Sequence, residues 1–241
     1  MDKKDWQKKG AGHRQRLRDK FIEKGIGSFT DAEILELLLS LGTPRQDCKE
    51  RARAAIKRFG SLAAVLETPL ETLQEIKGIG PNNAFAVRFV HETARKFLKE
   101  RPRGKSYINA ASEVVEYLRH SMTRRETEVF VAIFLDSRNG VIDIQELFQG
   151  TLSSSAVYPR EVIKTALSMN AAAMVFAHNH PSGHLEPSPA DHAITRRLFL
   201  AAKLMEMNVL DHIIIGNGEK YYSFAEHGIM DEICQANASL L

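Results

Sequence analysis

The residues best suited to chemistry lie between positions 177 and 193, in the segment AHNHPSGHLEPSPADHA. His178 and His180 stand two positions apart at the end of an apolar run that predicts a strand. Side chains two apart in extended backbone point to the same side, so both imidazoles can reach one ion. With the carboxylate of Asp191 they form the usual protein ligand set of a catalytic zinc, which leaves one position for water.

The segment also predicts where Asp191 lies. Ser188 and Pro189 have the types expected at the N-cap and first position of a helix, which makes Asp191 its third residue. An acid there commonly turns back to the N-cap, but it could instead project toward the preceding loop. Imidazole with carboxylate suits zinc better than magnesium or calcium, so we predict one Zn²⁺ per chain. The histidine pair alone is equally compatible with a plain surface turn.

The full pattern is more specific than the histidine pair. HNHPSG at 178–183, followed by Ser188-x-x-Asp191, resembles the JAMM (MPN+) metalloprotease motif. This motif, together with PREV at 159–162, LDHIIIG at 210–216 and SFAE at 223–226, looks like the RadC branch of the family. The resemblance runs through residues 106–232, and the N-terminal segment is similar to that of RadC as well.

The resemblance implies an MPN/JAMM-type domain with zinc held by the two histidines and Asp191, a bound water as fourth ligand, and hydrolysis of a peptide or isopeptide bond. It also implies that Ser188 steadies the oxyanion and that a glutamate just before the first core strand acts as general base. Glu128 is the best match for that glutamate, and Glu126, two residues earlier, is the weaker one. Tyr158 stands where the family has a histidine, so no role for that histidine carries over.

Other polar residues near the motif receive plainer interpretations. His184 and His192 do not match the ligand spacing, and we expect them to be exposed. His212 lies in an apolar run and is expected to be a core histidine or to support a ligand. Residues 153–155, three consecutive serines, could line a cleft or form an ordinary polar loop.

The elements that must position this site alternate between strand and helix, which predicts an α/β (α+β) domain with a mixed sheet over residues 107–241. Asn139-Gly140 predicts a hairpin between two of the strands. The expected strands are 129–135, 141–148, 172–177, 209–215 and 221–224, and the expected helices are 160–169 and 189–207.

The preceding residues predict a small all-helical domain over 26–99, with a basic N-terminal arm at 1–25 and a charged linker at 100–106. The arm is expected to be mobile or to form a short basic helix. Capping boxes are expected at Thr30–Glu33 and Thr68–Glu71, and Gly60 should end a helix that begins at Cys48. A longer helix is expected over 81–98, with Ala84, Val87, Phe89, Val90 and Ala94 buried.

The sequence at 73–84 resembles a helix-hairpin-helix motif, in which Lys77, Gly78 and Gly80 would contact a DNA backbone. Residues 1–105 carry 23 Lys and Arg against 14 Asp and Glu, whereas residues 106–241 carry 10 against 16. A basic half of this kind favours nucleic acid as a partner. The alternative is a helical hairpin that packs against protein.

Composition excludes several classes of protein. The two cysteines, Cys48 and Cys234, form neither a disulfide framework nor a cysteine zinc module. No apolar run is long enough to span a bilayer, and the N-terminus lacks the apolar core of a secretory signal, so we predict a cytoplasmic protein without a membrane partner.

Three functions are compatible with these features. The leading one is a zinc-dependent peptidase-like hydrolase, acting on an unidentified protein or peptide near DNA. The alternative is a non-catalytic DNA-binding factor of repair or recombination, which the traditional name of the RadC family suggests. A two-metal nuclease is disfavoured, because such sites need several clustered carboxylates and the motif supplies one.

Overall fold

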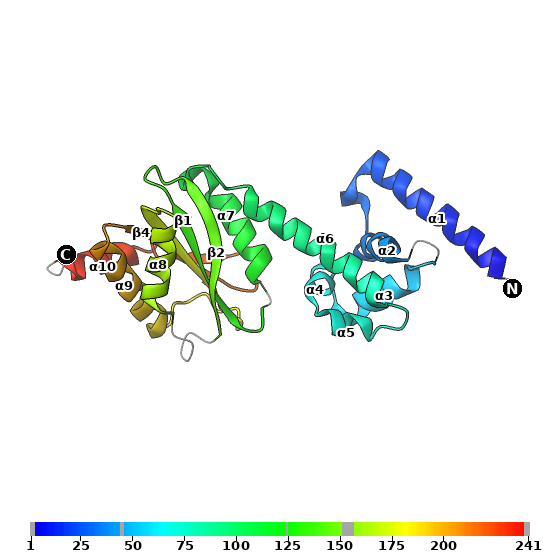
Figure 1. Cartoon of the computed structure of the whole chain (residues 1–241). Helices are drawn as coiled ribbons and strands as arrows, with labels where there is room; N and C mark the ends of the chain where they lie inside the picture. Colours follow the sequence, from blue (N-terminus) through cyan, green and yellow to red (C-terminus); the bar gives the residue numbers. More distant parts are fainter. Residues whose placement is uncertain (1–2, 44–45, 124, 151–156, 239–241) are drawn as a thin grey trace. The chain divides into compact units, whose positions relative to one another are not determined.

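The computed structural model describes residues 3–43, 46–123, 125–150 and 157–238, with side chains described from residue 12 onward. The chain divides into two compact units, residues 1–94 and 95–241, and the division falls inside helix α6 (Pro81–Glu100). Figure 1 labels most of the helices and strands of each unit. The serines at 153–155, considered above for the cleft, lie outside the described residues.

The second unit is built on a five-stranded sheet in the order β2-β1-β3-β4-β5. β3 and β4 are parallel, while the other neighbours are antiparallel, so the predicted mixed sheet is confirmed. The strands are β1 (Glu128–Leu135), β2 (Val141–Gly150), β3 (Ala173–Asn179), β4 (Asn208–Ile215) and β5 (Tyr221–Ser223).

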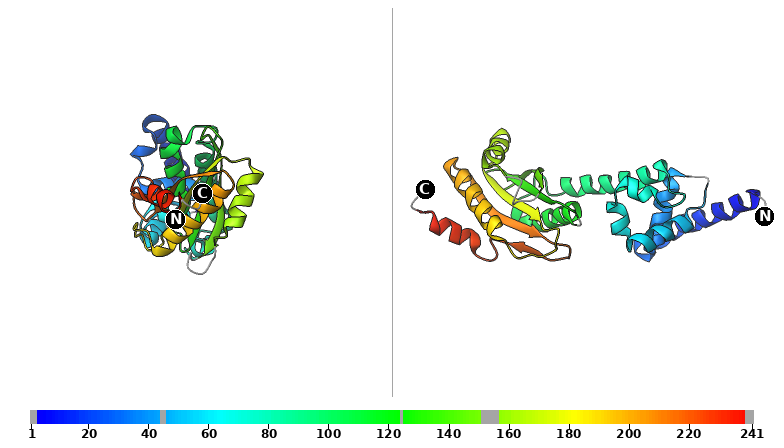
Figure 2. Two further views of the ribbon diagram at one scale, coloured as in Figure 1. Left: turned by 90° about the vertical axis from the view of Figure 1, so that its left-hand side faces the viewer. Right: turned by 90° about the horizontal axis from the view of Figure 1, so that it is seen from below.

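Helices cover both faces of this sheet (Figures 1 and 2). One face packs against α7 (Tyr107–Met122), and the other against α8 (Pro159–Ser168), α9 (Pro189–Leu204) and α10 (Ile229–Ala236). Seven of the eight residues of β1 are buried, because its odd-numbered side chains face α7 and its even-numbered ones face α8 and α9. The sequence prediction contained neither α7 nor α10.

The hairpin between β1 and β2 follows its sequence signal. Asn139 has a positive φ of 57°, and the Asp136 carboxylate accepts the Gly140 N–H at 2.8 Å, which closes the turn. Residues 100–106, predicted to be a linker, are joined to the start of β2. Gly104 N–H donates to the Val141 carbonyl at 2.8 Å, and Val141 N–H donates to the Lys105 carbonyl at 2.9 Å.

The first unit is all helical, as predicted. It contains α1 (Lys3–Lys24), the 3-10 turn η1 (Ile26–Ser28), α2 (Asp31–Gly42), α3 (Lys49–Phe59), α4 (Leu62–Glu67), α5 (Leu70–Gln74) and the start of α6. The described part of the expected arm is therefore helical. None of the helices in the described part of the chain is long and apolar enough to cross a membrane.

Two of the three local signals in this unit are confirmed. Thr30 and Glu33 form a capping box, and Gly60 ends α3 in the left-handed conformation. The capping box expected at Thr68 is wrong, because the Thr68 hydroxyl donates to the Ala64 carbonyl at the end of α4 (2.6 Å). Pro69 is consequently the N-cap of α5 and not its first residue.

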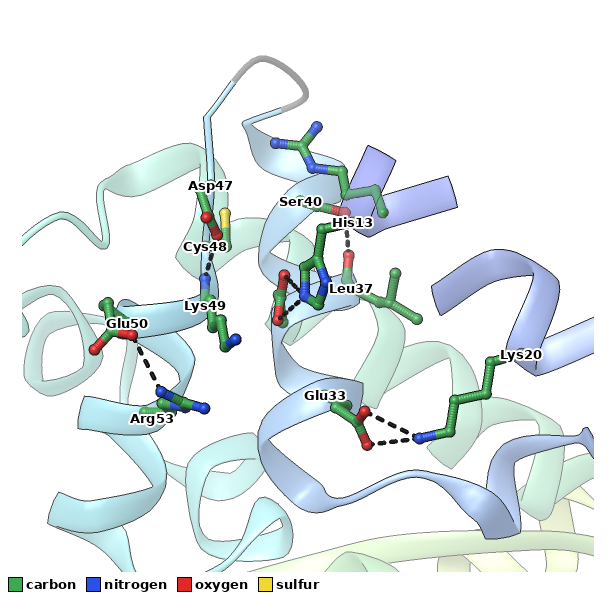
Figure 3. Close-up of polar contacts among 12 residues, drawn as sticks. His13, Lys20, Glu33, Leu37, Ser40, Asp47, Cys48, Lys49, Glu50 and Arg53 are labelled. Carbon is green, nitrogen blue, oxygen red and sulfur yellow. Dashed lines mark hydrogen bonds and ion pairs between the residues drawn. The ribbon is translucent and has the colours of Figure 1, made fainter. Parts of the chain in front are cut away.

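Ion pairs join α1 to α2 (Figure 3). Lys20 Nζ lies 2.9 Å from Glu33 Oε2, and His13 Nε2 lies 3.1 Å from Glu36 Oε1. The Lys20 ammonium also lies 4.6 Å from the centre of the Phe29 ring. Glu33 and Glu36 of α2 therefore each have a partner on α1.

The turn between α5 and α6 is fastened to α2 by Asn83. Its buried amide donates to the Leu39 carbonyl at 2.6 Å and to Thr43 Oγ1 at 2.7 Å. Gly42 approaches the same place so closely that an added Cβ would clash with the Asn82 carbonyl. These contacts fix the turn at residues 77–80 against the body of the unit.

The buried face of α6 differs in part from the sequence prediction. Ala84 and Val87 are buried as expected, and His91 continues the same face one turn later. Phe89, expected to be buried, is 61% exposed, because it projects from a different face and stacks on Phe85 at 5.7 Å between ring centres. Ala94 is exposed as well, and Val90 is half-buried.

Candidate metal centre

Two histidine side chains meet where β3 ends. The apolar residues 173–177 bury β3 on both faces, and His178 is the first ligand-type side chain that follows them. The His180 N–H donates to the Ile215 carbonyl at 2.9 Å, which continues the pairing with β4 and keeps both rings on one side. The two Nε2 atoms lie 2.9 Å apart.

Asp191 reaches the same point from the start of α9. Its Oδ2 accepts hydrogen bonds from both the N–H and the hydroxyl of Ser188, each at 2.7 Å, while Ser188 Oγ accepts the Asp191 N–H at 3.2 Å. The predicted N-cap at Ser188 is thus confirmed. The sequence left two options for Asp191, which could turn back to the N-cap or project toward the preceding loop. The carboxylate does both, because Oδ2 bonds to Ser188 while Oδ1 lies 3.1 Å from His178 Nε2.

The donor atoms fit a metal ion. Ligand atoms of His178, His180 and Asp191 all lie within 4.8 Å of one another, and Asp191 Oδ1 is buried without a hydrogen bond of good geometry. His180 Nδ1–H donates to the His184 carbonyl at 2.8 Å, so a neutral His180 ring presents a lone pair at Nε2. A cation would satisfy both the orphaned oxygen and the two facing nitrogens, so the three residues could hold a metal ion.

Charge states in the cluster follow from these contacts. Burial alone would raise the pKa of Asp191, but the close His178 and His180 rings, at 3.1 and 3.3 Å, outweigh it and hold that pKa well below its usual range. The pKa of His180 is raised, chiefly by its hydrogen bond to Asp191, and the Glu128 charge adds to the effect. Burial, reinforced by the nearby His178, lowers the pKa of His212 well below its ordinary value.

The register of the sheet brings Glu128 to this cluster. Phe130 is opposite His178 at the end of the antiparallel pairing of β1 and β3. Extending that register by two residues puts Glu128 opposite His180, in accord with the effect of the Glu128 charge on the His180 ring. Residues of the same parity share a face of the sheet, which puts Glu128 on the side of the histidines. Glu126 is exposed and precedes the strand.

Asn179, between the two histidines, holds the backbone on either side of Glu128. Its Oδ1 accepts the Val129 N–H at 2.7 Å, and its Nδ2 donates to the Thr127 carbonyl at 3.2 Å. The amide thereby continues the connection between β1 and β3 beyond their last paired residues. Sequence reasoning missed this contact, because Asn179 and Val129 are fifty residues apart.

The remaining candidates around the cluster have clear positions. The Ser188 hydroxyl donates its hydrogen bond to Asp191. It would have to rotate before it could donate to an oxyanion instead. His184 and His192 are exposed, as expected. His212 is fully buried and lies with Nε2 2.9 Å from His178 Nδ1. Tyr158 is exposed at the N-cap of α8, with the Arg160 guanidinium 5.2 Å from its ring centre.

The residues predicted to contact DNA lie together at the turn before α6. Lys77 and Gly78 are exposed, Gly80 is half-buried, and Gly78 has a φ of +91° that favours glycine. Arg51 of α3 lies against this turn, since a Cβ on Gly78 would be 2.6 Å from Arg51 Nε. The contact of Arg51 with the turn was not predicted, because α3 and the turn are far apart along the chain.

Comparisons with known proteins cover both units. Residues 108–229 match the model of the RadC-like JAB domain, and residues 8–85 match the UPF0758 N-terminal domain. UPF0758 proteins of Nitrosomonas eutropha and Nitrosomonas europaea are 44% and 43% identical over 216 residues, which is 90% of this chain and 96% of theirs. A UPF0758 protein of Janthinobacterium is 40% identical over 213 residues, 88% of this chain and 95% of that protein.

Proposed function

Because the chain belongs to the UPF0758 (RadC) family and carries a RadC-like JAB domain, we propose that it is a zinc-dependent hydrolase of peptide or isopeptide bonds. The observation that carries the proposal is the convergence of His178, His180 and Asp191 around a buried, unsatisfied carboxylate oxygen. Two imidazoles and a carboxylate leave a zinc ion with an open position, the arrangement typical of catalytic and not of structural zinc.

The chemistry divides between the ion and the chain. When bound, zinc supplies Lewis acidity, which makes a water nucleophilic near neutral pH and polarises a carbonyl. Glu128 accepts a proton from the attacking water and returns it to the leaving nitrogen, so that proton transfer is balanced over the cycle. Its place opposite His180 and its charge effect on that ring support this role. Ser188 holds Asp191 and, after rotation of its hydroxyl, donates to the oxyanion.

The proposal is tested on the purified full-length chain. We expect elemental analysis to find about one zinc ion per chain after gentle preparation, in line with a three-ligand site. We also expect a panel of peptide and isopeptide substrates to contain at least one that is cleaved, with cleavage lost on chelation and regained when Zn²⁺ is added. A preparation without zinc, or cleavage insensitive to chelation, contradicts the proposal, whereas zinc without turnover favours a binding role.

A second candidate function, DNA binding by the N-terminal unit, is favoured by the exposed turn at residues 77–80. Lys77 and Gly78 are exposed there, and Lys77 and Arg51 place positive charge at the turn, where a phosphate could bind. Such contacts read the backbone and not the base sequence. In combination with the first proposal, this unit would bring the hydrolase to a protein substrate near DNA.

We expect Lys77→Ala to weaken binding to a fluorescent DNA duplex and to reduce the salt dependence of log K by about one counterion, as measured by anisotropy over a salt series. Lys164→Ala, the same change at an exposed position on α8, is the matched control and should leave binding unchanged. His178→Ala should also leave it unchanged. Absence of binding at low salt would rule the DNA role out.

A further inference from the structure

The two ligands His178 and Asp191 are connected a second time, behind the cluster, by two buried side chains. His178 Nδ1 lies 2.9 Å from His212 Nε2, and His212 Nδ1 lies 2.6 Å from Thr195 Oγ1. Thr195 Oγ1 in turn lies 2.5 Å from the Asp191 backbone carbonyl. His178, His212, Thr195 and Asp191 have essentially no exposed surface, so water does not compete for these contacts.

The direction of each hydrogen bond follows from the carbonyl at its end. A carbonyl only accepts, so the Thr195 hydroxyl donates its single proton to Asp191. Thr195 Oγ1 must then accept from His212, which places the His212 proton on Nδ1. A neutral imidazole has one N–H, so His212 Nε2 accepts from His178 Nδ1–H. The other nitrogen of His178, Nε2, faces the cluster 3.1 Å from Asp191 Oδ1, and in the neutral ring that a metal ligand requires it carries the lone pair.

The surroundings of His212 favour the neutral ring that this sequence of bonds requires. The rings of Phe130, Phe176 and Phe224 have their centres 5.6, 6.2 and 5.0 Å from the centre of the His212 ring. An imidazolium enclosed by apolar rings and removed from water is costly. His212 therefore acts as an acceptor toward His178 and not as a second cation beside it.

We propose that Thr195 and His212 are positioning residues that set the tautomer of His178, so that its Nε2 is held as a lone pair toward a divalent metal. The same bonds tie α9, which carries Asp191, through β4 to β3, which carries His178. The proposal rests on the metal-binding part of the proposed function and is independent of whether the site hydrolyses anything.

The decisive variant is Thr195→Val, which keeps the branched shape and removes the hydroxyl. His212 Nδ1 then has no acceptor at this position, and the His212 proton can move to Nε2. His178 must in response accept at Nδ1 and carry its own proton on Nε2, where the metal would bind. We expect the affinity for Zn²⁺, measured by competition with a chromophoric chelator, to fall roughly 10- to 100-fold, the usual effect of removing a partner behind a metal ligand.

Two variants separate this role from general stability. Thr195→Ser keeps the hydroxyl that accepts from His212. Its affinity for Zn²⁺ should therefore stay within about threefold of that of the original chain. Thr165→Val removes an equivalent hydroxyl on α8, where Thr165 Oγ1 donates to the Glu161 carbonyl at 2.9 Å. This matched control should leave Zn²⁺ affinity unchanged.

A second measurement reports the tautomer directly and needs no metal. Two-bond ¹H–¹⁵N correlation spectra of histidine-labelled protein should show a proton on Nδ1 of His178 in the original chain and the loss of that Nδ1 proton in Thr195→Val. If Thr195→Val fails to fold, His212→Phe removes the acceptor while keeping a ring among the phenylalanines, and the same loss of Zn²⁺ affinity is expected.

The outcomes are distinguishable. If the original chain binds Zn²⁺ and the folded variants bind it as tightly, with the His178 tautomer unchanged, the proposal is overturned. If the original chain binds no Zn²⁺, the metal premise fails, and the metal role of Thr195 and His212 fails with it. If zinc binds, the variants weaken it and no substrate is cleaved, the positioning role stands while the hydrolase proposal falls.

Discussion

Replacing Glu128 with Gln is expected to lower the rate of hydrolysis by about 10²- to 10⁴-fold while zinc remains bound, the range typical for loss of a general base. Glutamine keeps the size and the hydrogen-bonding ability of the side chain but cannot take a proton. The sheet register puts residue 128 opposite His180, and the Asn179 amide holds the peptide groups on both sides of it. The change therefore removes a proton acceptor without moving the strand.

The rate is to be measured on the best-cleaved substrate of the peptide panel, together with the zinc content of each variant. Glu126→Gln is a matched control, because it makes the same chemical change two residues earlier at an exposed position before β1. It should alter the rate by less than about twofold, as expected for a residue that transfers no proton. A large loss in Glu126→Gln with none in Glu128→Gln would assign the base to Glu126 instead.

The second large effect is expected from removal of a ligand. In the original chain, Zn²⁺ at about 100 times its dissociation constant should stabilise the fold by about 2.7 kcal/mol. For a chain of this size that corresponds to a rise in melting temperature of roughly 5–10 °C. His180→Ala removes one of the two facing Nε2 atoms, and we expect this zinc-dependent rise to disappear.

His184→Ala serves as the control for this experiment. His184 is exposed and contributes its backbone carbonyl to His180 Nδ1, which alanine retains. Its melting temperature should rise with Zn²⁺ as that of the original chain does. A zinc-dependent rise that persists in His180→Ala would mean that the ion binds elsewhere or without this imidazole.

Local sequence patterns correctly predicted the start of a helix where that start depends on a few neighbouring residues. The capping boxes at Thr30 and Ser188 lie within four consecutive residues, and both helices begin there. Thr68 has the same residue pattern, but its hydroxyl is used by the preceding helix α4, so the pattern failed. Helix α7 was missed although Ala110, Val114 and Leu118 follow helical spacing and are buried.

The cluster of His178, His180 and Asp191 was also predictable, because strand spacing and the helix start place its members, whereas the contacts that support it were not. Thr195 and His212 are seventeen residues apart and meet only because α9 packs on β4. The sequence contained a weak sign of this contact, since Thr195 follows Asp191 by one helical turn and can bond back to its carbonyl. Nothing in the sequence indicates that the asparagine between the histidines would bond to the strand of Glu128.

The helix start at Ser188 has a consequence for which ions the site accepts. With Oδ2 of Asp191 occupied by the Ser188 N–H and O–H, Oδ1 is the carboxylate oxygen left without a hydrogen bond. We therefore expect Asp191 to offer a metal ion one oxygen, Oδ1. Calcium takes roughly six to eight oxygens, often from bidentate carboxylates, and magnesium prefers an octahedron of oxygens. The proposed preference for zinc would then arise from this single carboxylate oxygen, which helix capping leaves free, as well as from the two imidazoles.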